Sequence, residues 1–270
     1  MNTNTSLPIP TKEMERALIK KFRKYLWSPF IRAIIDFEMI QQNDRIAIAI
    51  SGGKDSLVMA KLMQELYRHS DIPFEPVFIS MNPGFSKENE SSLIANCKAM
   101  DIPVHFFQSD IFEVTTSIAK ENPCYMCARM RRGHLYAKAK ELGCNKIALG
   151  HHFDDVIETT LINMLYAGTM KTMTPKVPST SGKLELIRPL IYVKEADIID
   201  YTKTNGIRAM NCGCTIEAGK TSSKRREVKN LLAELEEKNP GVKQSVFNSM
   251  RNINLDYVFG YTGGNVNKDK

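Results

Sequence analysis

The stretch of sequence that decides the fold is Arg45-Ile46-Ala47-Ile48-Ala49-Ile50-Ser51-Gly52-Gly53-Lys54-Asp55-Ser56. Its first six residues form a short apolar run, which predicts a buried strand. From Leu57 onward apolar residues recur at helical spacing, so we expect a helix to begin there. A glycine turn between a strand and a helix N-terminus exposes free backbone N–H groups, and the helix dipole favours an anion at that place. The sequence therefore predicts a phosphate site at residues 51–56.

The side chains of this loop fit the same kind of ligand. Lys54 adds a positive charge, Asp55 can hold Mg²⁺, and the hydroxyl groups of Ser51 and Ser56 can bond phosphate oxygens. The loop is not a Walker A motif, because Ile48 and Asp55 stand where that motif needs glycine and serine or threonine. The hexapeptide SGGKDS instead resembles the pyrophosphatase loop of the N-type ATP pyrophosphatases. Those enzymes cleave ATP between its α- and β-phosphates, adenylate a substrate and release pyrophosphate. The alternative is a turn that only links a strand to a helix.

The composition of the chain limits its class. It has 270 residues with 43% apolar side chains, which is enough for one large or two small globular domains. No apolar run reaches the ~20 residues that span a bilayer, and the first residues lack the pattern of a secretory signal. We therefore expect a cytoplasmic protein without a membrane partner. The net charge of +7 favours a polyanionic partner without establishing one.

Strands and helices are predicted to alternate after residue 44. The expected strands cover residues 45–50, 76–81, 104–108 and 146–149, and the expected helices cover residues 57–69, 87–100, 125–142 and 154–166. This order predicts an α/β fold with a doubly wound parallel sheet. Ligands of such sheets bind beyond the carboxyl ends of the strands, so we expect residues 51–56, 81–85 and 150–155 to form the rim of one site. Further along we expect a loop at 168–183, a strand at 186–193, and helices at 194–205 and 225–238.

The two ends of the chain differ from its middle. Residues 13–40 have a helical pattern that Pro29 is expected to divide into two helices. Its basic residues fit either RNA contact or a solvated surface: Lys20, Lys21, Arg23 and Lys24. We divide the chain into a helical segment at 1–40, an ATP pyrophosphatase catalytic domain at 41–255 and a disordered tail at 256–270.

The cysteines indicate a metal site. Cys124 and Cys127 form a CxxC pair, which can ligate one metal ion or cluster or act as a redox pair. Cys212 and Cys214 form a second close pair, which favours metal binding over redox chemistry. Zinc would use all four thiolates. An iron–sulfur cluster with three cysteine ligands would leave one of the second pair as a spectator.

The two remaining cysteines, Cys97 and Cys144, stand alone among apolar or helical neighbours. We expect both to be packed and inert thiols.

Taken together, the motifs resemble the tRNA 2-thiocytidine synthetase family of tRNA thiolases, over roughly residues 20–255. The resemblance is carried by SGGKDS at 51–56, by CYMCARMRRGHLYAKAKELGCNKIALGHHFDD at 124–155, by NMLYAGTMK at 163–171, by PK at 175–176, and by a cysteine after RPL at 188–190. It implies an N-type ATP pyrophosphatase fold with N- and C-terminal helices. It also implies an enzyme that adenylates the C2 oxygen of a cytidine in the tRNA anticodon loop, after which sulfur displaces AMP.

The same resemblance implies the cofactors and partners. ATP, Mg²⁺ and a [4Fe–4S] cluster are the expected cofactors, and tRNA is the expected substrate. Cys124 and Cys127 would be two cluster ligands and Cys212 or Cys214 the third. We prefer Cys212, although the single residue between the later cysteines departs from the family, in which two are expected. A sulfur donor such as a cysteine desulfurase or sulfide, and a homodimer, are also implied.

The chemistry of adenylation assigns the remaining site residues. Lys54 and Mg²⁺ held by Asp55 would offset charge that develops on the phosphates, and Asp155 would support Mg²⁺ or the substrate. Gly150 and His151 are expected to complete the nucleotide site. His151 and its neighbour His152 are either bases or phosphate contacts, or they only pack the loop.

Asp154 is a better candidate than Asp155 for capping the following helix. Other basic residues are candidates for RNA phosphate contacts: Arg129, Arg131, Arg132, Lys171, Lys176, Lys220, Lys224, Arg225 and Arg226.

Two other functions fit part of the sequence. A sulfur transferase that acts on a free base or another small molecule would need no separate RNA-binding domain, and none is evident. A zinc-stabilised nucleotide-binding module without catalysis would account for four cysteines, but not for the complete SGGKDS loop.

Overall fold

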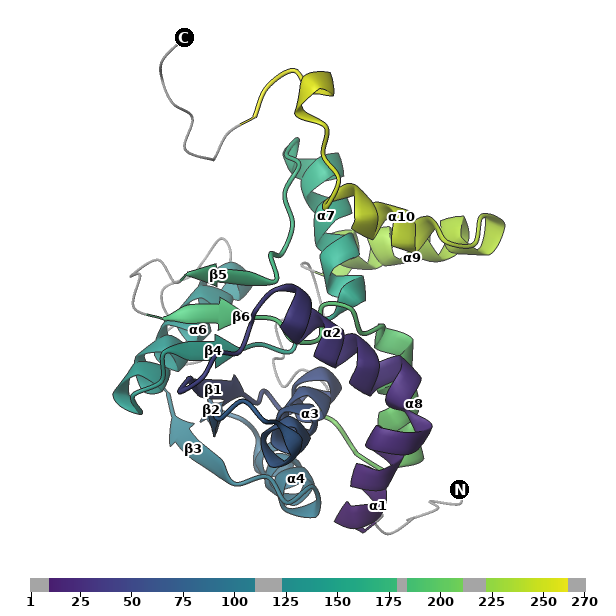
Figure 1. Cartoon of the computed structure of the whole chain (residues 1–270). Coiled ribbons are helices and arrows are strands. Elements are labelled where there is room, and N and C mark those ends of the chain that lie inside the picture. Colours follow the sequence, from purple (N-terminus) through teal and green to yellow (C-terminus); the bar gives the residue numbers. More distant parts are fainter. Residues whose placement is uncertain (1–9, 110–122, 179–183, 211–221, 262–270) are drawn as a thin grey trace.

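The computed structural model describes residues 10–109, 123–178, 184–210 and 222–261, with the backbone alone described at 123–129 and 222–223. Its centre is a six-stranded sheet of order β3-β2-β1-β4-β6-β5 (Figure 1). The strands are β1 (Arg45–Ala49), β2 (Glu75–Asn82), β3 (Val104–Gln108), β4 (Lys146–Ala148), β5 (Lys176–Pro178) and β6 (Glu185–Ile187). Neighbouring strands run parallel, except that β5 pairs antiparallel with β6.

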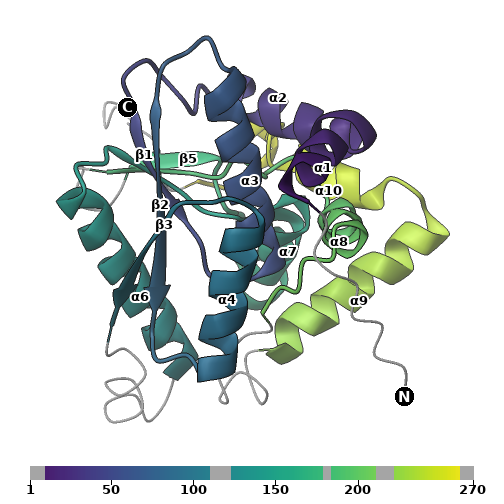
Figure 2. The ribbon, with the colours of Figure 1, turned by 90° about the horizontal axis from the view of Figure 1, so that it is seen from below.

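Helices cover both faces of the sheet, as a doubly wound fold requires. Figure 2 shows α6 (Pro123–Glu141) on one side and α3 (Lys54–His69) with α4 (Lys87–Ala99) on the other. The side of α3 also carries α7 (Phe153–Ala167), α8 (Glu195–Thr204), α9 (Ser222–Lys238) and α10 (Val242–Ser249), which contribute to the same buried cluster. The predicted α/β fold class is confirmed.

The alternation within β1 explains how one strand serves two cores. Ile46 and Ile48 are completely buried in the larger cluster beneath α3, whereas Ala47 and Ala49 face the smaller cluster beneath α6. Successive side chains of a strand point to opposite faces, so this period of two fixes the register. Burying each isoleucine side chain contributes roughly 1.5–3 kcal/mol.

The N-terminal helices pack on the same larger cluster. They run through α1 (Thr11–Arg16), two π-helical segments (Ala17–Lys21 and Arg23–Trp27) and α2 (Ser28–Asp36). The predicted division at Pro29 corresponds to the boundary between the second π-helical segment and α2, because Pro29 lies in the first turn of α2. A second interruption, at Phe22 (φ −97°, ψ 11°), was not predicted.

A buried lysine joins these N-terminal helices to α3 and to the residue that follows α4. Lys61 of α3 is fully buried, and its Nζ lies 2.7 Å from a carboxylate oxygen of Glu15 and donates to the carbonyl of Met100. Such a charge is tolerated in an interior only when it is paired and hydrogen-bonded. The first helix therefore belongs to the same packed body as α3 and α4.

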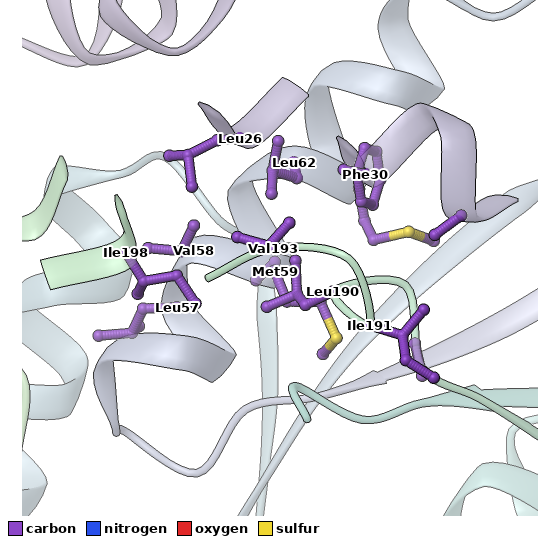
Figure 3. Packing of buried hydrophobic residues seen from close by; sticks show 14 of the residues in the cluster. Leu26, Phe30, Leu57, Val58, Met59, Leu62, Leu190, Ile191, Val193 and Ile198 are labelled. Carbon is purple, nitrogen blue, oxygen red and sulfur yellow. The ribbon is translucent and has the colours of Figure 1, made fainter. Parts of the chain in front are cut away.

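The apolar run at 186–193 is only partly a strand. β6 ends at Ile187, and the chain then turns, with Val193 N–H donating to the carbonyl of Leu190 at 2.8 Å. Leu190, Ile191 and Val193 belong to the larger buried cluster, and Figure 3 shows Leu190 and Val193 close to Met59 of α3. Buried apolar side chains mark a core position but do not distinguish a strand from a turn, which is why the prediction was wrong here.

Three short elements were not predicted. β5 lies within the expected loop at 168–183, and α10 and a 3₁₀ turn (Leu255–Tyr257) follow α9. β5 has three residues and ends in proline, which is typical of an edge strand. None of the helices in the described ranges is long and apolar enough to cross a membrane.

Candidate active site

A cavity of about 640 Å³ lies at the carboxyl ends of four adjacent strands. It is lined by Met81 near the end of β2, Ser51 after β1, Gly150 after β4 and Arg188 after β6. This is the edge where the strand order reverses, and such switch points hold ligands in α/β sheets. The volume is in the range of small-molecule sites. The structure thus brings together the predicted loops at 51–56 and 150–155, whereas of residues 81–85 only Met81, within β2, lines the cavity.

The glycine loop is closed by its own serines. Ser56 Oγ accepts from the backbone N–H of Ser51 at 3.1 Å and donates to the carbonyl of Gly53 at 2.9 Å. Gly52 has φ +85°, a torsion that favours glycine, and Gly53 is the N-cap of α3. A Cβ on Gly52 would lie 2.6 Å from Cε of Met210. The loop is therefore a shaped helix N-terminus that suits an anion.

Lys54 lies between two carboxylates. Its Nζ is 3.0 Å from Oε1 of Glu195 and 3.3 Å from Asp55. Burial works against the charge, but Asp55 and Glu195 outweigh it and raise the pKa of Lys54. Burial raises the pKa of Asp55, which His152 and Lys54 lower only in part. Oδ1 of Asp55 is buried and accepts no hydrogen bond from the described residues.

The loop at 150–155 packs tightly on the glycine loop. A Cβ on Gly150 would lie 3.1 Å from the backbone of Asp55 and Ser56, so glycine permits the two loops to touch. His152, and not Asp154, caps α7: its ring Nδ1 accepts from the backbone N–H of Asp155, and the Asp155 carboxylate accepts from the backbone N–H of His152. The predicted capping role of Asp154 is wrong, because its carboxylate binds the backbone N–H of Glu195 at 2.8 Å instead.

Asp155 and His151 face the cavity. Asp155 Oδ1 is 2.8 Å from Arg225 of α9, which also approaches Glu158 at 3.4 Å. Burial alone would raise the pKa of Asp155, but His152 and Arg225 are among the groups that hold it below its ordinary value. Burial, with Arg188 nearby, lowers the pKa of His151 to about 4, so the imidazole is neutral near pH 7.

Comparison with known proteins decides the family. The PP-loop domain family matches residues 18–211. A tRNA-cytidine(32) 2-sulfurtransferase of Geobacter sulfurreducens is 36% identical over 84% of this chain and 89% of its own length. One of Pelobacter propionicus is 36% identical over 91% of both chains. The chain belongs to the tRNA-cytidine(32) 2-sulfurtransferase family. The recognised resemblance is confirmed.

A solved structure supports the fold of this sulfurtransferase family member. The U34-tRNA thiolase NcsA from Methanococcus maripaludis, determined with its [4Fe–4S] cluster, has a TM-score of 0.67. It is 22% identical, and the match covers 93% of this chain and 85% of that one. The likeness shows that the two proteins share a fold.

The CxxC pair of this sulfurtransferase family member lies in the first turns of α6. Cys127 precedes the cavity residue Arg131 by four positions, about one turn of the same continuous helix. Cys212 and Cys214 lie outside the described residues, and within the described ranges no group of three or more candidate metal ligands occurs. Met210, two positions before Cys212 in sequence, donates its backbone N–H to the carbonyl of Gly52 at 2.9 Å.

The isolated cysteines are packed, as predicted. Both Cys97 and Cys144 are buried and free. Burial raises the pKa of Cys97 to about 11, and burial also raises the pKa of Cys144. Neither thiol has the lowered pKa of a reactive cysteine.

The candidate RNA contacts separate in the structure. Arg131 and Arg132 line the cavity, whereas Arg225 is an ion-pair partner of Asp155. Lys176 binds the carbonyl of Glu38, and Lys224 lies 4.7 Å above the ring of Tyr166. Lys220 and the side chain of Arg129 are outside the described part.

Three site residues were missed or misread from the sequence. Glu195 and Lys229 were not singled out, although Glu195 binds both Lys54 and Lys229. Arg188 was noted only as part of the RPL segment, although it lines the cavity. These residues are recognised from the three-dimensional structure, because each reaches the site from a distant part of the chain. Only the position of Arg188 directly after a strand could have marked it in advance.

Proposed function

We propose that this protein is an ATP-dependent tRNA sulfurtransferase that converts cytidine 32 of the anticodon loop to 2-thiocytidine. The observation that carries the proposal is the match to two tRNA-cytidine(32) 2-sulfurtransferases at 36% identity over nearly their whole length. The geometry agrees with it, because the glycine loop, two carboxylates and a cavity of suitable size meet at one edge of the sheet.

Different residues of the chain have different roles in the adenylation step. The N-terminus of α3 and its loop bind the β- and γ-phosphates, and Lys54 offsets charge on the phosphates as pyrophosphate leaves. The C2 oxygen of the cytidine attacks the α-phosphate and the bond to pyrophosphate breaks. Sulfur at the sulfide level then attacks C2, and AMP departs with the oxygen. With sulfide as the donor each step is a displacement and requires no electron donor, whereas persulfide sulfur from a cysteine desulfurase would first have to be reduced by two electrons, for example by a thiol.

Mg²⁺ is proposed to bind the two carboxylates at the loop. Asp55 and Asp155 both line the cavity, and Oδ1 of Asp55 is a buried oxygen without a hydrogen bond from the described residues. Carboxylate oxygens are the ligands that Mg²⁺ prefers. The ion would neutralise charge that develops on the phosphates.

A [4Fe–4S] cluster is proposed at the cysteines. Cys124, Cys127 and either Cys212 or Cys214 would hold it, and thiolates are the usual ligands of such clusters. The placement of the CxxC pair one turn before a cavity residue supports this set. The cluster would hold or deliver the sulfur atom that is transferred to the cytidine. Sulfide or a cysteine desulfurase as donor, and a homodimer, complete the proposal.

Nucleoside analysis tests the reaction. tRNA from a strain that lacks this gene is digested and examined by mass spectrometry for 2-thiocytidine. We expect the thiolated nucleoside to disappear and to return with the wild-type gene but not with Lys54→Ala. Unchanged thiolated tRNA in the deletion strain would contradict the tRNA reaction and favour a small-molecule substrate.

A further inference from the structure

Arg188 lines the cavity at the carboxyl end of β6. It directly follows β6, and its backbone N–H donates to the carbonyl of Pro175 at 2.9 Å. Its Nη1 donates to the carbonyl of Thr174. β6 is two strands from β1, the strand that leads into the glycine loop. Two strand spacings separate these positions by roughly 10 Å.

The side chain of Arg188 is half-buried, and its guanidinium makes no ion pair within the described ranges. Its Nε is buried and has no hydrogen-bond acceptor there. Burial lowers the pKa of this arginine and Arg132 lowers it further, while Tyr136 and Asp155 act in the opposite direction. A partly buried charge without an ion-pair partner is costly, so this arrangement favours binding of an anion.

Two more arginines approach the same part of the cavity. Arg131 and Arg132 of α6 line it, and neither makes an ion pair with a described residue. The two carboxylates in the cavity lining are engaged elsewhere, Asp55 with Lys54 and Asp155 with Arg225. Three guanidinium groups therefore line the cavity without an ion-pair partner of their own among the described residues, while the lining carboxylates are paired with other cations.

We propose that Arg188, assisted by Arg131 and Arg132, forms a second phosphate site in the cavity, separate from the glycine loop. A guanidinium presents a planar set of N–H donors that matches two phosphate oxygens at once. The anchored Arg188 sets the position of the phosphate, and the α6 arginines add charge from the rim.

This inference rests on the proposed function, which supplies two sources of such a phosphate. One is the α-phosphate of the nucleotide, which becomes part of AMP. The other is the phosphodiester beside the target nucleotide of the RNA. Both present the same chemistry to Arg188, and binding measurements separate them.

The test uses the full-length protein purified without oxygen. Affinities for AMP, inorganic pyrophosphate and a synthetic anticodon stem-loop RNA are measured by calorimetry for the wild type, Arg188→Lys and Arg132→Gln. Arg188→Lys keeps the charge but loses the planar fork. We expect it to weaken either AMP or RNA binding by about tenfold or more, with pyrophosphate affinity unchanged, because pyrophosphate occupies the loop.

The ligand that weakens identifies the source of the phosphate. Arg16→Gln is the matched control, because Arg16 is exposed on α1 outside the cavity, and it should change no affinity. If Arg188→Lys does not fold, the double variant Arg131→Gln/Arg132→Gln on the helix face tests the same site. Unchanged AMP and RNA affinities in folded variants would overturn the inference. A wild-type protein that binds neither pyrophosphate nor RNA would instead contradict the proposed function.

Discussion

Glu195 at the start of α8 binds Lys54 of the glycine loop through a 3.0 Å ion pair. The other carboxylate oxygen lies 2.5 Å from Nζ of Lys229 in α9. The backbone N–H of Glu195 is fixed in turn by Asp154 at 2.8 Å. Glu195 is thus expected to act as a positioning residue, because it holds the lysine that is proposed to contact the phosphates.

Replacement of Glu195 should slow the reaction at the glycine loop while the loop itself stays folded. In Glu195→Gln the pKa of Lys54 falls, because one of the carboxylates that raise it is lost. We expect kcat for pyrophosphate release to fall roughly 10- to 100-fold, the range of a charged hydrogen bond. The alkaline limb of the pH–rate profile should move to lower pH. Glu75→Gln, which removes an exposed ion pair with Arg45, is the control. An unmoved alkaline limb would argue against a positioning role.

The same carboxylate should shape acid stability. Burial would raise the pKa of Glu195, but Lys229 and Lys54 lower it from 4.5 to about 2. A carboxylate whose pKa is lowered by folding stabilises the folded protein at pH values above its ordinary pKa. This contribution is lost as the pH falls from 4.5 towards 2. Urea unfolding across this range should show the wild type losing its advantage over Glu195→Gln. A constant difference between the two proteins would contradict the assignment.

Two glycines should respond to alanine in opposite ways. Gly150→Ala brings a Cβ to 3.1 Å from the backbone of Ser56, so we expect destabilisation of about 1–3 kcal/mol and slower adenylation. Gly133 lies within α6 with no atom near its Cβ position, so Gly133→Ala should stabilise the helix by about 0.5–1 kcal/mol. Thermal unfolding of both variants measures this. Equal stability of Gly150→Ala and wild type would show that the loops are not in close contact.

His151 should remain neutral in mildly acidic solution. Its pKa is lowered to about 4, first by burial and then by Arg188, against an ordinary 6.5. NMR titration of labelled histidine should therefore show no protonation of His151 at pH 5.5. The fold disfavours the charged ring, so the neutral ring of His151 stabilises the folded protein above pH 6.5. This stabilisation is lost as the pH falls through 6.5 towards 4. Glutamine at this position should abolish that part of the pH dependence, and titration near 6.5 would contradict the burial argument.

Cysteine variants should separate the cluster from packed thiols. Cys124→Ala should remove the visible absorbance and bound iron from protein purified without oxygen, because a proposed ligand is lost. Cys97→Ala should retain both, since Cys97 is a buried thiol whose pKa is about 11. Iron analysis and absorption spectra provide the comparison. A colourless wild-type protein with stoichiometric zinc would contradict the cluster.

The parts of the site that the sequence predicts are those built from local chain geometry. Ser51 and Gly150 each follow an apolar strand, and parallel strands bring their carboxyl ends to one edge, so their proximity could be expected. Glu195, Arg188 and Lys229 could not be placed this way, because ion pairs across long sequence separations leave no periodic pattern. The turn at 188–193 was misread for a related reason, since burial alone does not define backbone torsions.

The ion pairs of α9 bear on how this protein can be shortened. The PP-loop family match stops at residue 211, yet Arg225 and Lys229 lie beyond it. A fragment cut at that boundary would remove Arg225 from Asp155 and Lys229 from Glu195, leaving Lys54 as the ion-pair partner of Glu195. The limits of the matched domain are therefore not the limits of the ion-pair network at the site, and a shortened version for engineering or crystallisation should retain α9.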